Sequence, residues 1–376
     1  MRWASLVPVA VPANEKSAGG VCQTDSAAAR TSFAAIVAVA GFAVLITPAA
    51  TQTSMTAPPA KHGKAHDKPH DKAEPAAPAA AQTATGKNAR PGGAEPDLAF
   101  GAFQRGYFLE AFAIATRRAE EKADVKAMTL LGELYAGGLG VPEDDKRAAE
   151  WYRLAAARGD REGMFALAMF ALRGRAGPRD RQASAKWLAA AAKLGHPIAA
   201  YDLALLYMEG QLFPQDFTRA AELLREAAQA GNPEAQYALG TFYKLGRGVP
   251  KDAKEAARLW GLAAIADNPD AQVEYGIALF NADGVAKNEA AAAALFRKAA
   301  LHGSAIAQDR LARILAEGRG APKNPVEAVK WHLISKARGE TDLMLDDFVS
   351  NLDAATRAAG EKAAKPWLDA LRRGPS

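Results

Sequence analysis

The sequence predicts an all-α protein, a right-handed α-solenoid built from helix–turn–helix units that repeat every 36 residues. Three columns of residues recur at this interval. A glycine ends most units: Gly159, Gly195, Gly231, Gly303 and Gly339, with Asp267 in the remaining place. The second helix carries a large apolar residue: Trp151, Trp187, Leu223, Leu259, Leu295 and Trp331. An acidic or amide residue follows the turn: Asp144, Asp180, Asp216, Asp252, Asn288 and Asn324.

Residues 232–266 show why each unit is expected to be a pair of helices. Asn232 is a good N-cap, and Pro233 fits the first turn, where its missing N–H has no helical partner to lose. Gly246 and Gly248 end the first helix, because glycine adopts left-handed backbone angles without steric cost. The predicted buried stripe of the second helix is Ala256, Leu259, Ala263 and Ala264. Such a pair cannot bury its apolar faces alone, so neighbouring units must cover them.

The repeated pattern resembles the Sel1-like repeat, a relative of the tetratricopeptide repeat. Its clearest copies are ALGTFYKLGRGVPKD at 238–252 and LLGELYAGGLGVPED at 130–144. The resemblance covers residues 124–339 and implies six repeats. It also implies a scaffold or adaptor that binds other proteins, because the family mostly supplies binding surfaces rather than active sites.

Helical segments are expected to flank the repeats. Residues 96–123 are predicted to form an N-terminal capping pair, since end units of solenoids usually differ from the inner ones. Residues 340–376 are predicted to form C-terminal capping helices, in which Leu343, Leu345 and Trp367 cover the apolar face of the last repeat.

Residues 1–50 are predicted to be a signal peptide or an N-terminal membrane anchor. The apolar run from Phe33 to Ile46 follows a basic flank, and it is shorter than the roughly 20 residues that a membrane span needs. Small residues at Ala49 and Ala50 fit a cleavage site. This predicts a periplasmic or secreted protein, with anchoring in the inner membrane as the alternative. The long polar stretch ahead of the run also suggests that translation begins nearer Val21.

Residues 51–95 are predicted to be a disordered linker rich in Pro, Ala, His and Lys, because no apolar periodicity survives there. His62, His66 and His70 lie four residues apart within it. They are interpreted as part of a solvated spacer, and weak capture of a transition metal is the alternative. The only cysteine, Cys22, precedes the apolar run, so the processed chain is expected to contain no disulfide.

Charge and motifs exclude several functions. Residues 1–95 carry nine Lys/Arg against six Asp/Glu, and the rest of the chain carries 38 against 36, so the repeats offer no basic track for nucleic acid. No GxSxG, HExxH or phosphate-binding glycine loop occurs. We therefore expect no catalytic residues, no cofactor and no metal site. The alternative is a secreted hydrolase acting on cell-wall or β-lactam substrates, but the one Ser–x–x–Lys-like stretch begins at Ser184, in a column of buried alanines.

A partner-binding surface is predicted on the concave face, which the first helices of the repeats should line. Nine apolar or aromatic residues of the inner repeats are expected there: Phe165, Met169, Leu172, Tyr201, Leu205, Met208, Tyr237, Ile277 and Phe280. An apolar floor of this kind suits an extended or helical peptide. The alternative is that these side chains pack against the adjacent repeat.

The sequence thus predicts a non-catalytic, exported scaffold for protein–protein interaction. Its expected partner is another protein or peptide bound in the concave groove. Contact with a membrane is expected only through an uncleaved N-terminal segment, and the protein is expected to be a monomer. The resemblance implies an envelope regulator or assembly factor, for example in the control of exopolysaccharide.

Overall fold

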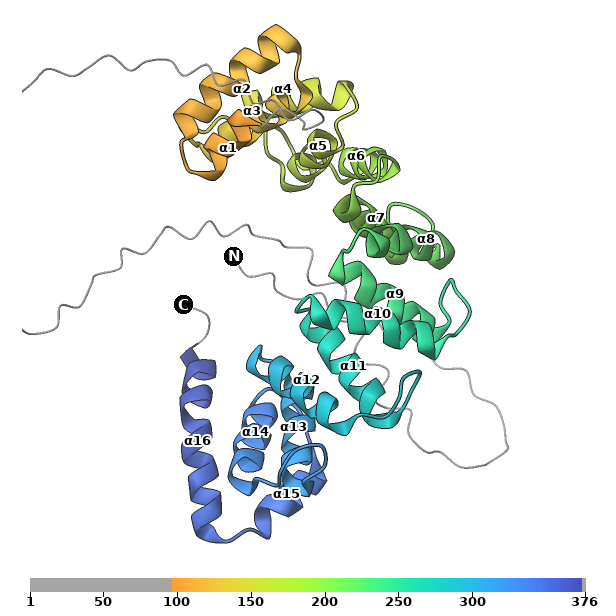
Figure 1. Ribbon diagram of the computed structural model, residues 1–376, viewed down its shortest axis with the longest axis vertical. Helices are drawn as coiled ribbons and strands as arrows, with labels where there is room; N and C mark the ends of the chain where they lie inside the picture. Colours follow the sequence, from red (N-terminus) through yellow and green to blue (C-terminus); the bar gives the residue numbers. More distant parts are fainter. Residues whose placement is uncertain (1–96, 374–376) are drawn as a thin grey trace, which may run out of the picture. The chain divides into compact units, whose positions relative to one another are not determined.

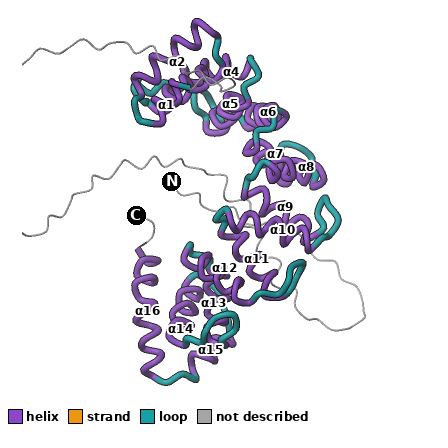
Figure 2. Tube along the Cα trace, in the orientation of Figure 1, coloured by secondary structure: helices purple, strands orange, loops and turns teal. Residues whose placement is uncertain are grey.

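Sixteen α-helices and no strand occur in residues 97–373, the part of the chain that the computed structural model describes (Figure 1; Figure 2). The prediction of an all-α solenoid with a 36-residue period is confirmed. The predicted signal peptide or anchor at 1–50, the linker at 51–95 and its three histidines lie outside the described residues. No helix among those described is both long enough and apolar enough to cross a membrane.

Each repeat contains two helices of 13 residues. The first helices are α3 (Val125–Gly137), α5 (Arg161–Arg173), α7 (Pro197–Glu209), α9 (Pro233–Leu245), α11 (Pro269–Asn281) and α13 (Ala305–Glu317). The second helices are α4 (Asp145–Ala157), α6 (Arg181–Lys193), α8 (Phe217–Gln229), α10 (Ala253–Ile265), α12 (Glu289–Leu301) and α14 (Pro325–Ala337). From α1 to α14, every helix packs against the next one in the chain, so the second helices α4 to α12 contact the first helix of their own repeat and that of the following repeat.

Side-chain caps start the repeat helices where the sequence places Asp, Asn or Ser. The Asn232 Oδ1 atom accepts a hydrogen bond from the Ala235 backbone N–H at 2.7 Å, and Asp252 accepts from two backbone N–H groups at 3.0 Å each. Each such cap stabilises a helix by about 1 kcal/mol. His196, which was not among the predicted caps, caps α7 in the same way.

The core lies between the two helices of each repeat and between successive repeats. Alanines at one first-helix column are fully buried and let the neighbouring helices approach closely: Ala199, Ala235, Ala271 and Ala307. The predicted column of large second-helix residues is only partly buried: Leu223, Leu259 and Trp331 are buried, whereas Trp151, Trp187 and Leu295 are half-buried. The residue after this column is buried in all six second helices: Tyr152, Leu188, Leu224, Trp260, Phe296 and His332.

The second glycine of the turn has a role that the sequence analysis did not assign. Gly246 ends α9 in a left-handed conformation, as predicted, but Gly248 contacts the preceding repeat. A Cβ atom at Gly248 would overlap the backbone carbonyl of Phe217, the first residue of α8. The same overlap would occur at Gly284 and Gly320. These glycines therefore set how closely the turn of one repeat approaches the previous repeat.

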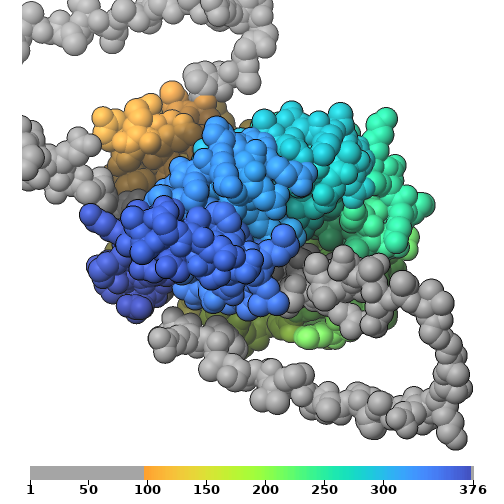
Figure 3. All heavy atoms as spheres, turned by 90° about the horizontal axis from the view of Figure 1, so that it is seen from below, coloured from red at the N-terminus to blue at the C-terminus, as the bar shows by residue number. Residues whose placement is uncertain are grey.

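Further helices lie at both ends of the repeats. α1 (Leu98–Gln104) and α2 (Phe108–Lys122) precede them, and α15 (Leu343–Ser350) and α16 (Ala354–Arg373) follow. α16 packs along α14, where the Trp367 ring meets the Trp331 ring at 5.3 Å between centroids. Figure 3 shows these last helices, in blue, as a closely packed surface. Leu345 is buried as expected, but Leu343 is 83% exposed and does not cover the last repeat.

Candidate partner-binding face

The nine predicted partner-binding residues lie on the first helices and are all half-buried. We call this surface the first-helix face. α5 carries Phe165, Met169 and Leu172, α7 carries Tyr201, Leu205 and Met208, α9 carries Tyr237, and α11 carries Ile277 and Phe280.

The aromatic column of this face packs between repeats. The Phe165 ring stacks on the ring of His196, the N-cap of α7, with centroids 4.3 Å apart. Phe165 and Tyr201 also pack against the largest core cluster. Burial raises the pKa of Tyr201 to about 12, so its hydroxyl stays neutral at physiological pH. Much of the surface of this column is therefore used within the solenoid, as the alternative interpretation of the sequence expected.

A second column, one helical turn further on, presents a different surface. Met169, Leu205 and Ile277 are half-buried there, and the same column holds Glu133 in α3 and Arg313 in α13. Apolar side chains of the inner repeats are thus flanked by an acidic residue at one end and a basic residue at the other. A partner segment could bury the remaining exposed apolar surface, which stabilises association by about 25 cal/mol for each Å² removed from water.

Half-buried acidic residues belong to this face as well, and the sequence analysis missed them. Asp202 of α7 and Glu274 of α11 occupy a column that elsewhere holds Ala166 and Ala238. Burial raises the pKa of Asp202 to about 6. Burial also raises the pKa of Glu274, against the opposing positive charges of Lys244 and Arg310. Charged residues in a column that also holds Leu130, Ala166 and Ala238 were the signal that could have revealed them.

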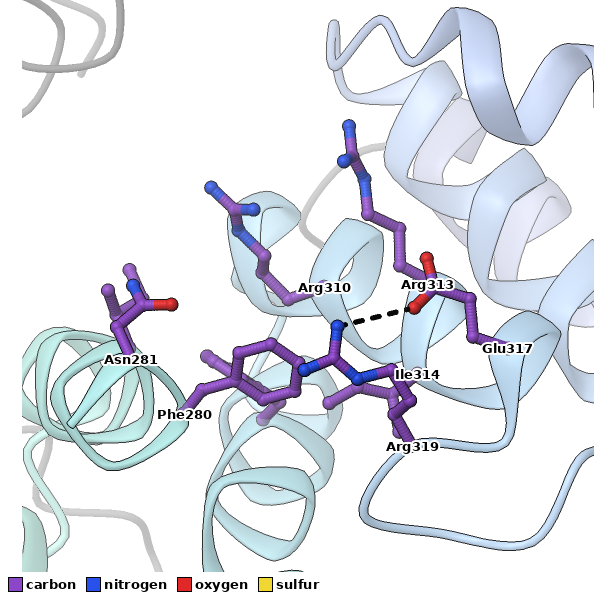
Figure 4. Close-up of a pocket in the computed structure, with 9 residues that line it drawn as sticks. Phe280, Asn281, Arg310, Arg313, Ile314, Glu317 and Arg319 are labelled. Carbon is purple, nitrogen blue, oxygen red and sulfur yellow. Dashed lines mark ion pairs between the residues drawn. The ribbon is translucent and has the colours of Figure 1, made fainter. Parts of the chain in front are cut away.

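A hollow of about 180 Å³ opens on this face between α11 and α13 (Figure 4). Ile277 and Phe280, both predicted site residues, line it together with Phe296 and Ile314. Polar groups surround these apolar side chains at the rim: Asn281, Arg310, Arg313, Glu317 and Arg319. The structure therefore brings two of the predicted residues into one concave site, whereas Phe165, Met169 and Leu172 lie on α5, outside it.

Ser184, His196 and His332 occupy structural positions within residues 97–373. No group of three or more His, Cys, Asp or Glu residues is placed to hold a metal ion within this range. Ser184 is buried in α6. The His196 Nε2 atom, at the start of α7, lies 3.1 Å from the Glu162 carboxylate of α5. The His332 Nε2 atom of α14 lies 2.8 Å from the Asp346 carboxylate of α15. Both histidines connect neighbouring helices.

The helix pairs, their fixed period and a face lined by first helices define a helical-repeat protein. The Sel1 repeat matches six consecutive segments: 125–160, 161–196, 197–232, 233–268, 269–304 and 305–340. The chain belongs to the Sel1 repeat family, as the sequence resemblance predicted. Proteins of this family generally mediate protein–protein interactions and are typically non-catalytic.

Solved structures of similar proteins agree with this assignment. A Sel1 repeat protein from Oxalobacter formigenes is 25% identical and superposes with a TM-score of 0.56, over 64% of this chain and 98% of that one. A protective antigen present in uropathogenic Escherichia coli strains, which displays an SLR fold, is 24% identical with a TM-score of 0.57. That alignment covers 74% of this chain and 64% of the antigen, so the chain spans less than two thirds of the antigen's length. No curated protein matches the sequence.

Proposed function

We propose that this chain is an exported, non-catalytic scaffold that binds a segment of another protein along its first-helix face. The observation that carries the proposal is the column of half-buried apolar side chains, Met169, Leu205 and Ile277, on the first helices. These residues keep part of their apolar surface in contact with solvent, in a column that ends at Arg313, beside the hollow between α11 and α13. A helical or extended peptide placed there would remove this surface from water.

Export is part of the proposal because of the apolar run from Phe33 to Ile46 and the small residues after it. A periplasmic or secreted scaffold of the Sel1 repeat family would act on envelope processes, for example as a regulator or assembly factor in the control of exopolysaccharide. The protein would work as a monomer with a protein partner, and it would need no cofactor.

Crosslinking and affinity capture from intact cells test the proposal. The test variant is Met169→Glu/Leu205→Glu/Ile277→Glu, which places three charges on the first-helix face. The matched control is Leu154→Glu/Leu262→Glu/Ile265→Glu, because these second-helix residues are 42%, 41% and 82% exposed. Both variants are first checked for wild-type circular dichroism and melting.

We expect the first-helix variant to lose a specific partner that the control variant retains. Truncating an interface hot spot costs about 2 kcal/mol or more, so the loss should exceed roughly tenfold in affinity. Equal capture by a folded first-helix variant and by the wild type would reject this face as the binding surface. Unfolding of that variant alone would show that the column belongs to the core.

A further inference from the structure

The hollow between α11 and α13 combines an apolar interior with a charged rim. Phe296 and Ile314 are only 2% and 3% exposed, and they form its base, while Ile277 and Phe280 line it from α11. Its volume of about 180 Å³ is comparable to a cavity of roughly 150 Å³ that binds benzene. The hollow is therefore large enough for one bulky apolar side chain.

Two of the three arginines at the rim have partners within the protein. The Arg313 guanidinium pairs with Asp342 and lies 3.6 Å from Asp309. The Arg319 guanidinium pairs with Glu289 at 2.6 Å. It also lies 4.6 Å from the centroid of the Phe280 ring, over the face of that ring, so it forms one wall of the hollow. The positive charges of Arg313 and Arg319 are therefore largely compensated by these carboxylates.

Arg310 differs from both. It is half-buried, and its guanidinium has no hydrogen bond or ion pair with any residue in the described part of the chain. The positive charge of Arg310 lowers the pKa of Glu274 on α11 and so opposes the effect of burial. Arg310 and Glu274 nevertheless form no ion pair. In Figure 4, Arg310 and Arg313 extend to the same side of the hollow, beyond the Phe280 ring. Arg310 thus offers a half-buried cation beside an apolar hollow, with no partner among the described residues.

We propose that this hollow is the anchor point for the partner segment, which inserts one bulky apolar side chain into it and pairs an adjacent aspartate or glutamate side chain with Arg310. The contact with Arg310 rests on charge complementarity, because a guanidinium and a carboxylate form a bidentate, charge-assisted pair. A side-chain carboxylate is the occupant rather than a chain terminus, because the column continues from Ile277 past Thr241 to the apolar Leu205 and Met169 and leaves the segment room to run on. The proposal rests on the proposed function and specifies the chemistry of its partner.

A phage library of random 12-residue peptides, selected against the full chain, tests the anchor. The selected peptides are then synthesised with amidated C-termini, so that side chains supply the only carboxylates, and their affinities are measured by fluorescence anisotropy. The protein variants are Arg310→Gln, Arg310→Lys and the control Arg297→Gln, which removes an exposed charge from α12. The peptide variant replaces the selected acidic residue by its amide.

We expect the selected peptides to carry an acidic residue close to a leucine, methionine or phenylalanine. Arg310→Gln should weaken binding about tenfold, and the amide peptide should bind wild type about tenfold more weakly. Combining Arg310→Gln with the amide peptide should weaken binding no more than either change alone. Arg310→Lys should bind more tightly than Arg310→Gln but less tightly than wild type. Arg297→Gln should leave the affinity unchanged.

Other outcomes separate this anchor from the general proposal. If binding is lost in Met169→Glu/Leu205→Glu but is unchanged by Arg310→Gln or by the amide peptide, the carboxylate anchor is wrong and the first-helix face stands. If the selected peptides bind both Met169→Glu/Leu205→Glu and Arg310→Gln as tightly as wild type, or if no peptide is enriched, both proposals are overturned.

Discussion

Replacing Gly248 by alanine tests whether the second glycine of the turn controls the packing of successive repeats. Its φ angle is +62°, and an added Cβ atom would overlap the Phe217 carbonyl of the preceding repeat. Gly231 is the matched control, because its φ angle is +89° while no atom lies within 4 Å of the added Cβ. Both substitutions impose the same kind of backbone strain, and only Gly248→Ala adds a clash.

The magnitudes follow from these two terms. Alanine in a left-handed conformation costs roughly 1–2 kcal/mol, and the lower entropy of the unfolded chain returns roughly 0.4–1 kcal/mol. Gly231→Ala should therefore lower the free energy of unfolding by about 1 kcal/mol or less. Overpacking adds roughly 1–3 kcal/mol, so Gly248→Ala should lower it by about 2–4 kcal/mol. The clash involves backbone atoms of α8, which cannot move aside as a flexible side chain could.

Urea unfolding followed by far-ultraviolet circular dichroism measures both values. Because repeat proteins can unfold in stages, the midpoints and the slopes are compared for the two variants. If Gly231→Ala and Gly248→Ala destabilise the protein equally within about 0.5 kcal/mol, the contact between the turn and the preceding repeat does not limit the packing, and the reasoning is refuted.

Three further predictions concern the ends of helices. Ala282→Gly should raise the free energy of unfolding by about 0.5–1 kcal/mol in urea titrations, because Ala282 ends α11 at a φ angle of +60° where most repeats have glycine. Asp252→Ala should lower it by about 1 kcal/mol in the same assay, because it removes the cap of α10. His196 should make the protein acid-sensitive. Its Nδ1 atom accepts the cap hydrogen bond from Ala199, and burial holds the pKa of His196 below its ordinary value, against the effect of Glu162. The stability that neutral His196 provides is complete above the unfolded pKa of about 6.5 and is lost as the pH falls through the folded pKa. Thermal melting from about pH 7.5 to about pH 5 should therefore destabilise wild type more than His196→Asn, in which the asparagine caps the helix without titrating; an equal loss in both would contradict this role.

The fold was predictable because its rules are local. Asn232, Gly246 and Asp252 indicate where helices begin and end. The 36-residue interval indicates that the same pair of helices recurs. Spacing also places residues on a common face of a helix. It does not give the angle between helices, and this angle decides that Tyr152 is buried while its neighbour Trp151 is only half-buried.

The candidate site was less predictable for the same reason. Ile277 and Phe280 are predicted site residues on one helix, but the hollow beside them depends on Arg310 and Arg319, which belong to the next repeat and its turn. Asp202, Glu274 and Arg310 lie in a first-helix column that contains none of the nine predicted residues. A charged residue in an apolar column of a repeat is a local exception, and its meaning appears only when the adjacent repeat is in place.

The contrast between columns explains where a repeat protein of this kind can encode a specific partner. Ala199, Ala235 and Ala271 occupy equivalent places in three repeats, because close helix packing admits only a small side chain there. The first-helix face has no such restriction: one of its columns holds Glu133, Met169, Leu205, Thr241, Ile277 and Arg313. Packing keeps the first set uniform, whereas the second set is free to vary in charge and shape. We propose that this variation serves recognition, with Arg310, which has no partner among residues 97–373, and the apolar hollow beside it as the contact point.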